Sequence, residues 1–373
     1  MRHSAPSDLQ PTTATMRSVS RYALPALLAL AGCRAPADRP VTLGAAGPWE
    51  LPVGIMARRG IELALADLNA DGGPGGRRVV VKFRDDGNDG ATAARVARDF
   101  AEDPAVVGVV GHLASTPMLA AARVYHESVA ALTPTATSPE LDGMSPWVVR
   151  LLPSDSVTGE RLGALVRARP GARVAVLYEN TAYGRGLAES FVRGLGREPV
   201  SIDPIAVDAS GLDPIIRRLA AGDPTLVFVA GNASRVPVYR ALRTALPSVP
   251  LLAGDGWAGI DDHLAPTATT IAVGFSPVDP RPEVQRFVAA FTRTYGVRPD
   301  AFAALAYDAT LALGRAAAAG GDREGTRRAL LTLADEAGYV TGPMRFAATG
   351  EPTGRDARLL AIDGRTLRAV RTP

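Results

Sequence analysis

From position 41 onward, short apolar runs alternate with segments in which apolar residues recur at helical spacing. Helical spacing is found through Ala57–Leu68, Val96–Phe100 and Leu119–Tyr125. The apolar runs predict strands at Val41–Gly44, Val79–Val81, Val106–Val110, Ala130–Thr133 and Trp147–Leu152. Strands that alternate with helices in this way are typical of a parallel sheet covered on both faces.

The same alternation starts again after Pro153. The middle of the chain is predicted to add strands at Val174–Tyr178, Thr225–Ala230, Leu251–Ala253 and Ile271–Phe275, separated by helices at Leu187–Leu195, Pro214–Ala221 and Val236–Leu246. The last third is predicted to hold helices at Glu283–Tyr295, Ala301–Ala318 and Glu324–Ala337, and then a strand pair, Gly342–Phe346 with Arg358–Ile362. The pattern therefore predicts an α/β fold with two sheets.

Length and charge narrow the function classes. A chain of 373 residues suits about two domains. Its net charge is only +3, and its basic residues are spread along the whole length, with Lys82 as the only lysine. A nucleic-acid-binding protein would gather its basic residues into a patch or stripe. The sequence has no such run, so we expect no nucleic-acid partner.

The N-terminal segment has the layout of an export signal. Two arginines precede an apolar stretch, Tyr22–Ala31, which is too short to span a bilayer. The stretch is followed by Gly32 and by Cys33, the single cysteine of the chain. This arrangement resembles the bacterial lipobox, in which the cysteine is acylated, although a lone cysteine is more commonly a small buried apolar residue.

We therefore predict a lipoprotein signal peptide at 1–33 that leaves the mature protein anchored to a membrane through Cys33. The true start is Met1 or Met16, because the first fifteen residues add nothing to an export signal. A tether rich in proline and alanine is predicted at 34–40.

The sequence lacks the motifs of the enzymes that share this fold class. A dinucleotide site needs Gly-x-Gly-x-x-Gly after a strand, but the first strand leads into Gly44–Trp49, which reads Gly-Ala-Ala-Gly-Pro-Trp. The sequence has no phosphate loop and no Gly-x-Ser-x-Gly elbow, and its four histidines show no metal-ligand spacing. We therefore expect no enzyme activity, no cofactor and no metal.

Two polar positions near the first sheet have competing interpretations. Asp85 and Asp86 suggest a carboxylate pair, but adjacent strand residues point to opposite faces, so we expect a solvated turn. His112 follows a strand, and the sequence is equally compatible with a histidine that borders a cleft and with a loop histidine bonded to the backbone.

Hydroxyl-rich segments follow two neighbouring strands. Gly111–Pro117, which contains Ser115 and Thr116, follows Val106–Val110, and Thr133–Leu141 follows the next strand. In an open α/β sheet, ligands bind beyond the carboxyl ends of the strands, where helix N-termini offer unpaired N–H groups. Each segment alone is compatible with an ordinary helix cap, which Ser and Thr favour. Two of them on one sheet edge favour a cradle for an anion.

These two segments resemble the leucine/isoleucine/valine-binding proteins of bacterial ABC importers. The resemblance covers Val41 to about Ile362, nearly all of the predicted mature chain. It rests on the order and spacing of several short matches, namely Val109–Ser115, Leu132–Leu141, Gly60–Ala64, Asp67–Gly73, Asp85-Asp86, Ala182–Ala188 and Thr341–Met344 with Phe346.

The resemblance implies two Rossmann-like lobes, the type I periplasmic binding protein fold, joined by three hinge crossings. The crossings fall near Leu151–Pro153, Phe275–Pro280 and Tyr339–Pro343. The implied first lobe is 41–152 plus 280–340, and the implied second lobe is 153–279 plus 341–373.

The resemblance also implies how an amino acid is held. Hydroxyls and backbone N–H groups of Ser115 and Thr137 take the ligand carboxylate, with Thr116 at the same helix start. The carbonyl of Thr135 and the acid Asp255 take the ammonium group, and Tyr183 closes over the ligand from the second lobe. A zwitterion needs donors at one end and acceptors at the other, because an unpaired buried charge is costly.

Several positions depart from the family pattern and concern the ligand side chain more than its headgroup. Asp255 is one methylene shorter than the usual glutamate, and Asn232 stands where an aromatic residue often lies. Trp49 falls in a first-lobe loop that is one residue longer than expected. The usual disulfide pair is replaced, around Asn88 and Ala114, by other residues.

We therefore expect an extracytoplasmic, lipid-anchored protein that captures a branched-chain-like amino acid or an analogue by hinge closure and delivers it to an ABC transporter permease. A ligand sensor of the same fold, for an amino acid or amide, is the alternative. An α/β enzyme would need reactive groups that the sequence lacks.

Overall fold

A computed structural model describes residues 39–258, 260, 269–335, 338–355, 358–363 and 366–370. Met1–Arg39 and Pro40–Pro373 are separate units, and the second is described here by itself. The predicted signal peptide at 1–33, with Cys33, lies outside the described residues, as does most of the tether at 34–40. No helix among the described residues is long and apolar enough to cross a membrane.

The first half of the unit builds a parallel sheet with the strand order β2-β1-β3-β4-β5. Its strands are β1 (Val41–Gly47), β2 (Val79–Asp85), β3 (Val106–Val110), β4 (Ala131–Thr133) and β5 (Val148–Arg150). The order reverses between β1 and β3, where loops at the carboxyl ends of the strands part and leave a crevice.

Helices cover both faces of this sheet. The helices α2 (Pro52–Asn69) and α10 (Ala301–Gly320) pack on one face, and α3 (Gly90–Glu102) and α4 (Ser115–Tyr125) pack on the other. Because both faces are covered, the strands β1, β3, β4 and β5 are almost entirely buried, whereas the edge strand β2 is partly exposed. The helix α11 (Arg323–Leu331) contacts α10 and β3.

The middle of the chain builds a second sheet with the order β14-β13-β10-β9-β8-β6-β7. Its parallel part consists of β6 (Val174–Glu179), β7 (Ser201–Ile205), β8 (Leu226–Ala230), β9 (Leu251–Ala253) and β10 (Thr269–Val273). The antiparallel strands β13 (Arg358–Asp363) and β14 (Thr366–Val370) extend it beyond β10.

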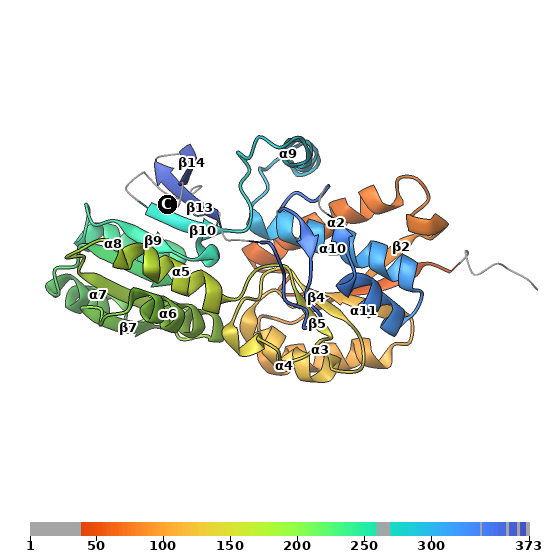
Figure 1. Cartoon of the computed structure of the whole chain (residues 1–373), viewed down its shortest axis with the longest axis horizontal. Helices are drawn as coiled ribbons and strands as arrows, with labels where there is room; N and C mark the ends of the chain where they lie inside the picture. The colour runs from red at the N-terminus through yellow and green to blue at the C-terminus, as the bar shows by residue number, and fades with distance from the viewer. Residues whose placement is uncertain are drawn as a thin grey trace, which may run out of the picture. The chain divides into compact units, whose positions relative to one another are not determined.

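The second sheet also has helices on both faces. The helices α5 (Asp155–Arg167) and α6 (Ala182–Leu195) pack on one face, and α7 (Leu212–Ala221) and α8 (Arg235–Ala245) pack on the other. The helix α9 (Pro282–Tyr295) follows this sheet and precedes α10 (Figure 1). The predicted α/β fold with two sheets is therefore confirmed.

Two predictions for the last third were wrong. The predicted helix Glu324–Ala337 ends at Leu331, because the backbone of β11 (Ala334–Asp335) pairs instead with β12 (Met344–Arg345). The segments Gly342–Phe346 and Arg358–Ile362 do not pair with each other, since β13 completes the open edge of β10. Positive φ at Gly342 and the missing N–H of Pro343 shorten the first of these segments to β12.

Candidate ligand-binding site

A cavity of about 370 Å³ lies at the carboxyl ends of strands from both sheets. Its first wall comes from loops after β2, β3 and β4 and from α10, and its second wall from loops after β6, β7, β8 and β9. The lining residues are Asn88, Leu113, Ala114, Ser115, Thr116, Pro117, Thr135, Glu179, Asn180, Thr181, Ala182, Tyr183, Arg185, Val207, Asn232, Ala233, Asp255, Gly256 and Phe302. Six of the eight predicted ligand-binding residues are among them: Ser115, Thr116, Thr135, Tyr183, Asn232 and Asp255.

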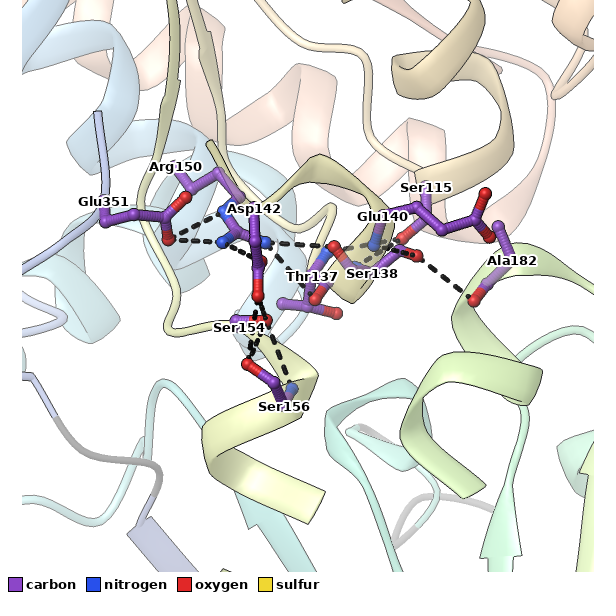
Figure 2. Close-up of polar contacts among 10 residues, drawn as sticks. All are labelled: Ser115, Thr137, Ser138, Glu140, Asp142, Arg150, Ser154, Ser156, Ala182 and Glu351. Atoms are coloured by element: carbon purple, nitrogen blue, oxygen red, sulfur yellow. Dashed lines mark hydrogen bonds and ion pairs between the residues drawn. The ribbon is translucent and has the colours of Figure 1, made fainter. Parts of the chain in front are cut away.

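Ser115 forms the donor end of the first wall. It is the first residue of α4. No side chain caps this helix, so its first N–H groups are left without a capping partner. The Ser115 Oγ instead accepts the backbone N–H groups of Thr137 (3.3 Å) and Ser138 (3.2 Å), as Figure 2 shows. Because the oxygen already accepts two hydrogen bonds, the hydroxyl hydrogen remains to be donated to an anion.

The loop after β4 supports this wall from behind. Thr135 lines the cavity, and its hydroxyl donates to the carbonyl of Leu113 at 2.5 Å, which ties the two loops together. Thr137 is buried behind Ser115 and is not one of the lining residues. Its N–H is directed to Ser115 Oγ, so it acts on the cavity through Ser115 in this structure.

On the second wall, the carboxyl group of Asp255 is hydrogen-bonded to the hydroxyl of Tyr183. The hydroxyl of Tyr183, near the start of α6, donates to Asp255 Oδ1 at 2.8 Å and accepts the N–H of Gly256 at 3.0 Å. Asp255 opens the short helix η4 (Asp255–Trp257) directly after β9. Two close-packed glycines make room for this ring, since a Cβ at Gly254 would lie 2.6 Å from the Tyr183 hydroxyl oxygen.

A second acid, Asp155, was not predicted. It lies at the start of α5, is 1% exposed, and donates its N–H to the carbonyl of Thr137 at 2.8 Å. Its Oδ2 is buried and has no hydrogen-bond partner among the described residues. The sequence Ser154-Asp155-Ser156 reads as a helix cap, and Ser154 does cap α5, so nothing local signals that the carboxyl group is buried.

Burial raises the pKa of both acids. Burial raises the pKa of Asp255 to about 6, against the opposing hydrogen bond from Tyr183. Burial, and then the charge of Asp255, raises the pKa of Asp155 above its usual range. Burial and the neighbouring carboxylates also raise the pKa of Tyr183, so its hydroxyl stays protonated as a donor. A cation placed beside these acids would offset the cost of ionising both.

Asn232 and Trp49 differ in where they lie. Asn232 lines the cavity, and its Oδ1 accepts a hydrogen bond from Arg235 at 3.1 Å. Trp49 is buried outside the lining, where its indole N–H donates to the carbonyl of Arg84 at 2.8 Å and its ring meets Phe83 edge to face.

The expectation of a solvated Asp86 was wrong. Asp86 and His112 are both fully buried, with Asp86 Oδ2 2.7 Å from His112 Nδ1. The other ring nitrogen of His112 lies 3.1 Å from the hydroxyl of Tyr125. Asp86 also accepts the N–H of Asn88 at 2.9 Å, so this triad joins the two loops that carry Asn88 and Ala114 to the cavity. His112 therefore does not line the cavity, and it is a loop histidine whose ring is bonded to side chains and not to the backbone.

The cavity suits a small molecule that has hydrogen-bond acceptors at one end and hydrogen-bond donors at the other. One wall carries a hydroxyl and uncapped helix N–H groups, and the other carries the carboxyl group of Asp255, whose charge also acts on the buried Asp155 outside the lining. Among the described residues, no group of three or more His, Cys, Asp or Glu side chains is arranged to hold a metal ion.

This arrangement defines a two-lobed α/β protein that binds a small ligand between its sheets. The sequence profile of the family described as periplasmic binding protein matches residues 41–366. The chain belongs to this family, and membership implies an extracytoplasmic location.

Individual relatives agree with this assignment. The chain is 28% identical over 320 residues to Leu/Ile/Val-binding protein homolog 1 of Brucella suis, a match that covers 82% of this chain and 84% of the relative. The ABC transporter substrate-binding protein from Desulfitobacterium hafniense in complex with Leu is 26% identical, with a TM-score of 0.76 over 89% of this chain and all (100%) of that chain.

The substrate-binding protein LivJ from Streptococcus pneumoniae in complex with isoleucine shares the fold, with a TM-score of 0.81 at 23% identity over 89% of this chain and 99% of that one. Together, these matches confirm the resemblance to the leucine/isoleucine/valine-binding proteins and the type I periplasmic binding protein fold.

Proposed function

We propose that this protein is the solute-binding component of an ABC importer and captures an amino acid through its carboxylate and ammonium groups. The observation that carries the proposal is the polarity of the cavity, with Ser115 and uncapped N–H groups on one wall and Asp255 on the facing wall. The relatives named for leucine, isoleucine and valine support the same ligand class.

In this proposal the first wall binds the carboxylate. The hydroxyl of Ser115 and the N–H groups that open α4, at Ser115 and Thr116, donate to it, and Thr137 holds Ser115 in place. The ammonium group lies at the second wall between Asp255, Asp155 and the carbonyl of Thr135. The buried Oδ2 of Asp155 supports this role, because an unpaired buried acceptor is costly until a donor reaches it.

The ligand side chain would lie against the apolar part of the lining. Leu113, Pro117 and Phe302 are buried and contribute apolar surface from the first wall. Asn232 and Tyr183 complete the opposite side. This apolar patch favours a branched-chain side chain, as in the ligands of the solved relatives.

Capture would proceed by hinge closure, because a ligand that contacts both walls stabilises the closed state. We divide the chain into a lobe of 41–152 plus 280–340 and a lobe of 153–279 plus 341–373. The two lobes already contact each other, for example where the hydroxyl of Ser138 donates to the carbonyl of Ala182 at 3.3 Å. The closed protein would then present the solute to a membrane permease.

The first test is thermal melting of the full chain against a panel of amino acids and amides. A ligand at about 100 times its Kd adds about 2.7 kcal/mol to the free energy of unfolding, which raises Tm by several degrees. We expect a rise with L-leucine, L-isoleucine or L-valine, and none with Asp255→Ala. If no amino acid raises Tm, the headgroup assignment is wrong.

The lipid anchor is a separate proposal that rests on the sequence around Cys33. Cys33→Ser would leave the protein unacylated, and it would move from the membrane fraction to the soluble fraction on cell lysis. An unchanged membrane fraction for this variant would contradict the anchor without affecting the ligand assignment.

A further inference from the structure

Arg150 occupies a buried position beneath the cavity that the ligand assignment does not use. It ends β5, directly before the first predicted crossing, and pairs with Thr133 of β4 in the parallel register. Its side chain is 1% exposed. Burying a guanidinium group costs free energy unless its N–H donors are paired. The hydrogen-bond partners of Arg150 therefore indicate which segments it positions.

Those partners come from two segments that are far apart in sequence, the segment 137–142 and Glu351. Arg150 Nη1 donates to the carbonyls of Ser138 (3.1 Å) and Thr137 (3.4 Å), and Nη2 donates to Asp142 Oδ1 at 2.6 Å. Nε donates to Glu351 Oε2 at 3.1 Å, and Nη2 contacts the same oxygen. Figure 2 shows Arg150 between Glu351 on one side and the 137–142 segment on the other.

These contacts fix the direction of one peptide group. The carbonyl of the Thr137–Ser138 peptide faces Arg150 and also accepts the N–H of Asp155 at 2.8 Å. Because the two ends of a trans peptide group point in opposite directions, its N–H faces the other way, where it donates to Ser115 Oγ. Arg150 therefore affects Ser115 Oγ indirectly, through the Thr137–Ser138 peptide group that lies between them.

The same segment is braced at its far end. Asp142 Oδ2 accepts hydrogen bonds from the hydroxyls of Ser154 (3.0 Å) and Ser156 (3.1 Å), at the start of α5. Asp142 Oδ1 is the oxygen that binds Arg150, so one carboxylate links the guanidinium to the helix that begins with Asp155. The donor wall and the start of the helix that carries Asp155 thus belong to a single hydrogen-bond network.

We propose that Arg150 is a positioning residue for carboxylate recognition: through the Thr137–Ser138 peptide it sets the orientation of Ser115, and Glu351 and Asp142 hold its guanidinium in place. This inference rests on the proposed function for its consequence in binding. Its structural part, the fixed orientation of the peptide, does not depend on the identity of the ligand.

The test is a double-mutant cycle on the full chain, with Kd for L-leucine measured by calorimetry. Arg150→Met is expected to raise Kd by about tenfold to a hundredfold, the effect of losing charge-assisted buried hydrogen bonds. It should be strongly non-additive with Ser115→Ala, because both act on one group, and nearly additive with Asp255→Asn on the other wall.

Arg323→Met is the matched control. Arg323 donates to the carbonyls of Phe100, Ala101, Asp103 and Val106, which are not cavity residues. It should lower Tm yet leave Kd within about twofold of the wild-type value, a difference of a few tenths of a kcal/mol. If Arg150→Met leaves Kd unchanged, or is additive with Ser115→Ala, the positioning role is wrong.

Hydrogen exchange of the Thr137 and Ser138 amides provides the second readout. Both amides should exchange faster in Arg150→Met than in Arg323→Met, with Arg150→Lys in between because it keeps the charge and loses the fork of donors. If Arg150→Met does not fold, Arg150→Lys serves in the cycle. If wild-type protein does not bind L-leucine, the proposed ligand fails, while unchanged exchange in the Arg150 variants would overturn the inference itself.

Discussion

At the scale of single residues, the cavity combines a donor whose hydrogen is available with acids that resist ionisation. Ser115 accepts two backbone N–H groups and so keeps its own hydrogen for a ligand. Asp255 is buried beside Tyr183, and burial raises its pKa to about 6. At mildly acidic pH, Asp255 therefore carries a proton, and an ammonium group must displace this proton to pair with the carboxylate.

The first prediction is a pH dependence of binding. Asp255 must be ionised to pair with an ammonium group, and its raised pKa means that it is protonated in the free protein as pH falls below about 6. Affinity for L-leucine should weaken by about tenfold per pH unit below 6 through the proton on Asp255, which competes with the ligand. Calorimetric titrations from pH 8 to pH 5 measure this.

Asp255→Asn is the control for that profile. It removes the titrating group, so binding should be weaker at pH 8 and its pH dependence should be flatter. A profile in the variant that matches the wild-type profile would assign the titration to another group.

At the scale of elements, close helix packing in the second lobe depends on glycine. A Cβ at Gly163 of α5 would lie 2.1 Å from the carbonyl oxygen of Phe191 in α6, and one at Gly194 would lie 2.1 Å from that of Glu160. Backbone atoms cannot give way as a flexible side chain can. The two helices therefore have only one close arrangement on the sheet, which fixes where α6 presents Tyr183.

We predict that Gly163→Ala destabilises the fold. Alanine is favoured over glycine within a helix by about 1 kcal/mol. The added methyl group overpacks the contact between the helices, which costs about 1–3 kcal/mol or more, so we expect a net loss of stability. At Gly90 of α3 a Cβ would meet nothing closer than 3.6 Å, so Gly90→Ala should be neutral or slightly stabilising. Urea unfolding of both variants decides between the two effects, and equal stabilities would contradict the packing argument.

A second element-scale prediction concerns the predicted third crossing, near Tyr339–Pro343. The buried carboxylate of Asp308 in α10 accepts the N–H groups of Val340 (3.0 Å) and Thr341 (2.7 Å). Asp308→Ala would leave both groups buried without an acceptor and should cost about 2–5 kcal/mol. Asp308→Asn keeps one acceptor and should cost less. Chemical denaturation measures both, and an Asp308→Ala protein as stable as wild type would contradict this assignment.

The elements that sequence alone predicted are those with unbroken apolar runs or long helical periodicity. Strand β7 was missed because Ser201–Ile205 is an edge strand that contains Pro204 and alternates in burial. Helix α5 was missed because its first turns are rich in serine, threonine and glycine. Strand β12 depends on a partner, β11, that has no pattern of its own.

The candidate site was predicted only where residues follow strands of the sheet or match family motifs. Ser115, Thr135 and Asp255 were found in this way and line one cavity. Asp155 and Arg150 were not, because their burial arises from segments that meet only in the folded protein. The hydrophobic pattern of the sequence predicts which helix or strand a residue belongs to. Whether a charged side chain is buried depends on which other segments pack over it, and the pattern does not show this.

At the scale of the whole molecule, the proposed function requires that ligand binding favours one arrangement of the lobes. A ligand shifts that equilibrium only by as much as it binds one state better than the other, and a shift from 1:99 to 99:1 needs about a 10⁴-fold difference. The proposed contacts of the ligand with Ser115 on one wall and Asp255 on the other would provide such a difference, since only a closed state satisfies both.

We predict that saturating L-leucine decreases the radius of gyration of the full chain in small-angle X-ray scattering. Asp255→Ala should remove the decrease, because the ligand then contacts one wall only. A ligand that binds, as judged by calorimetry, and leaves the radius unchanged would contradict hinge closure while leaving the ligand assignment intact.

The buried triad of Asp86, His112 and Tyr125 has a consequence for how the protein is made. It fastens the loops around Asn88 and Ala114 with side-chain hydrogen bonds, where related proteins were expected to use a covalent sulfur bridge. With one cysteine, residues 1–373 cannot form such a bridge within the chain. The first lobe should therefore mature without a thiol oxidase, and production in a reducing host cytosol or storage in dithiothreitol should leave its Tm unaltered.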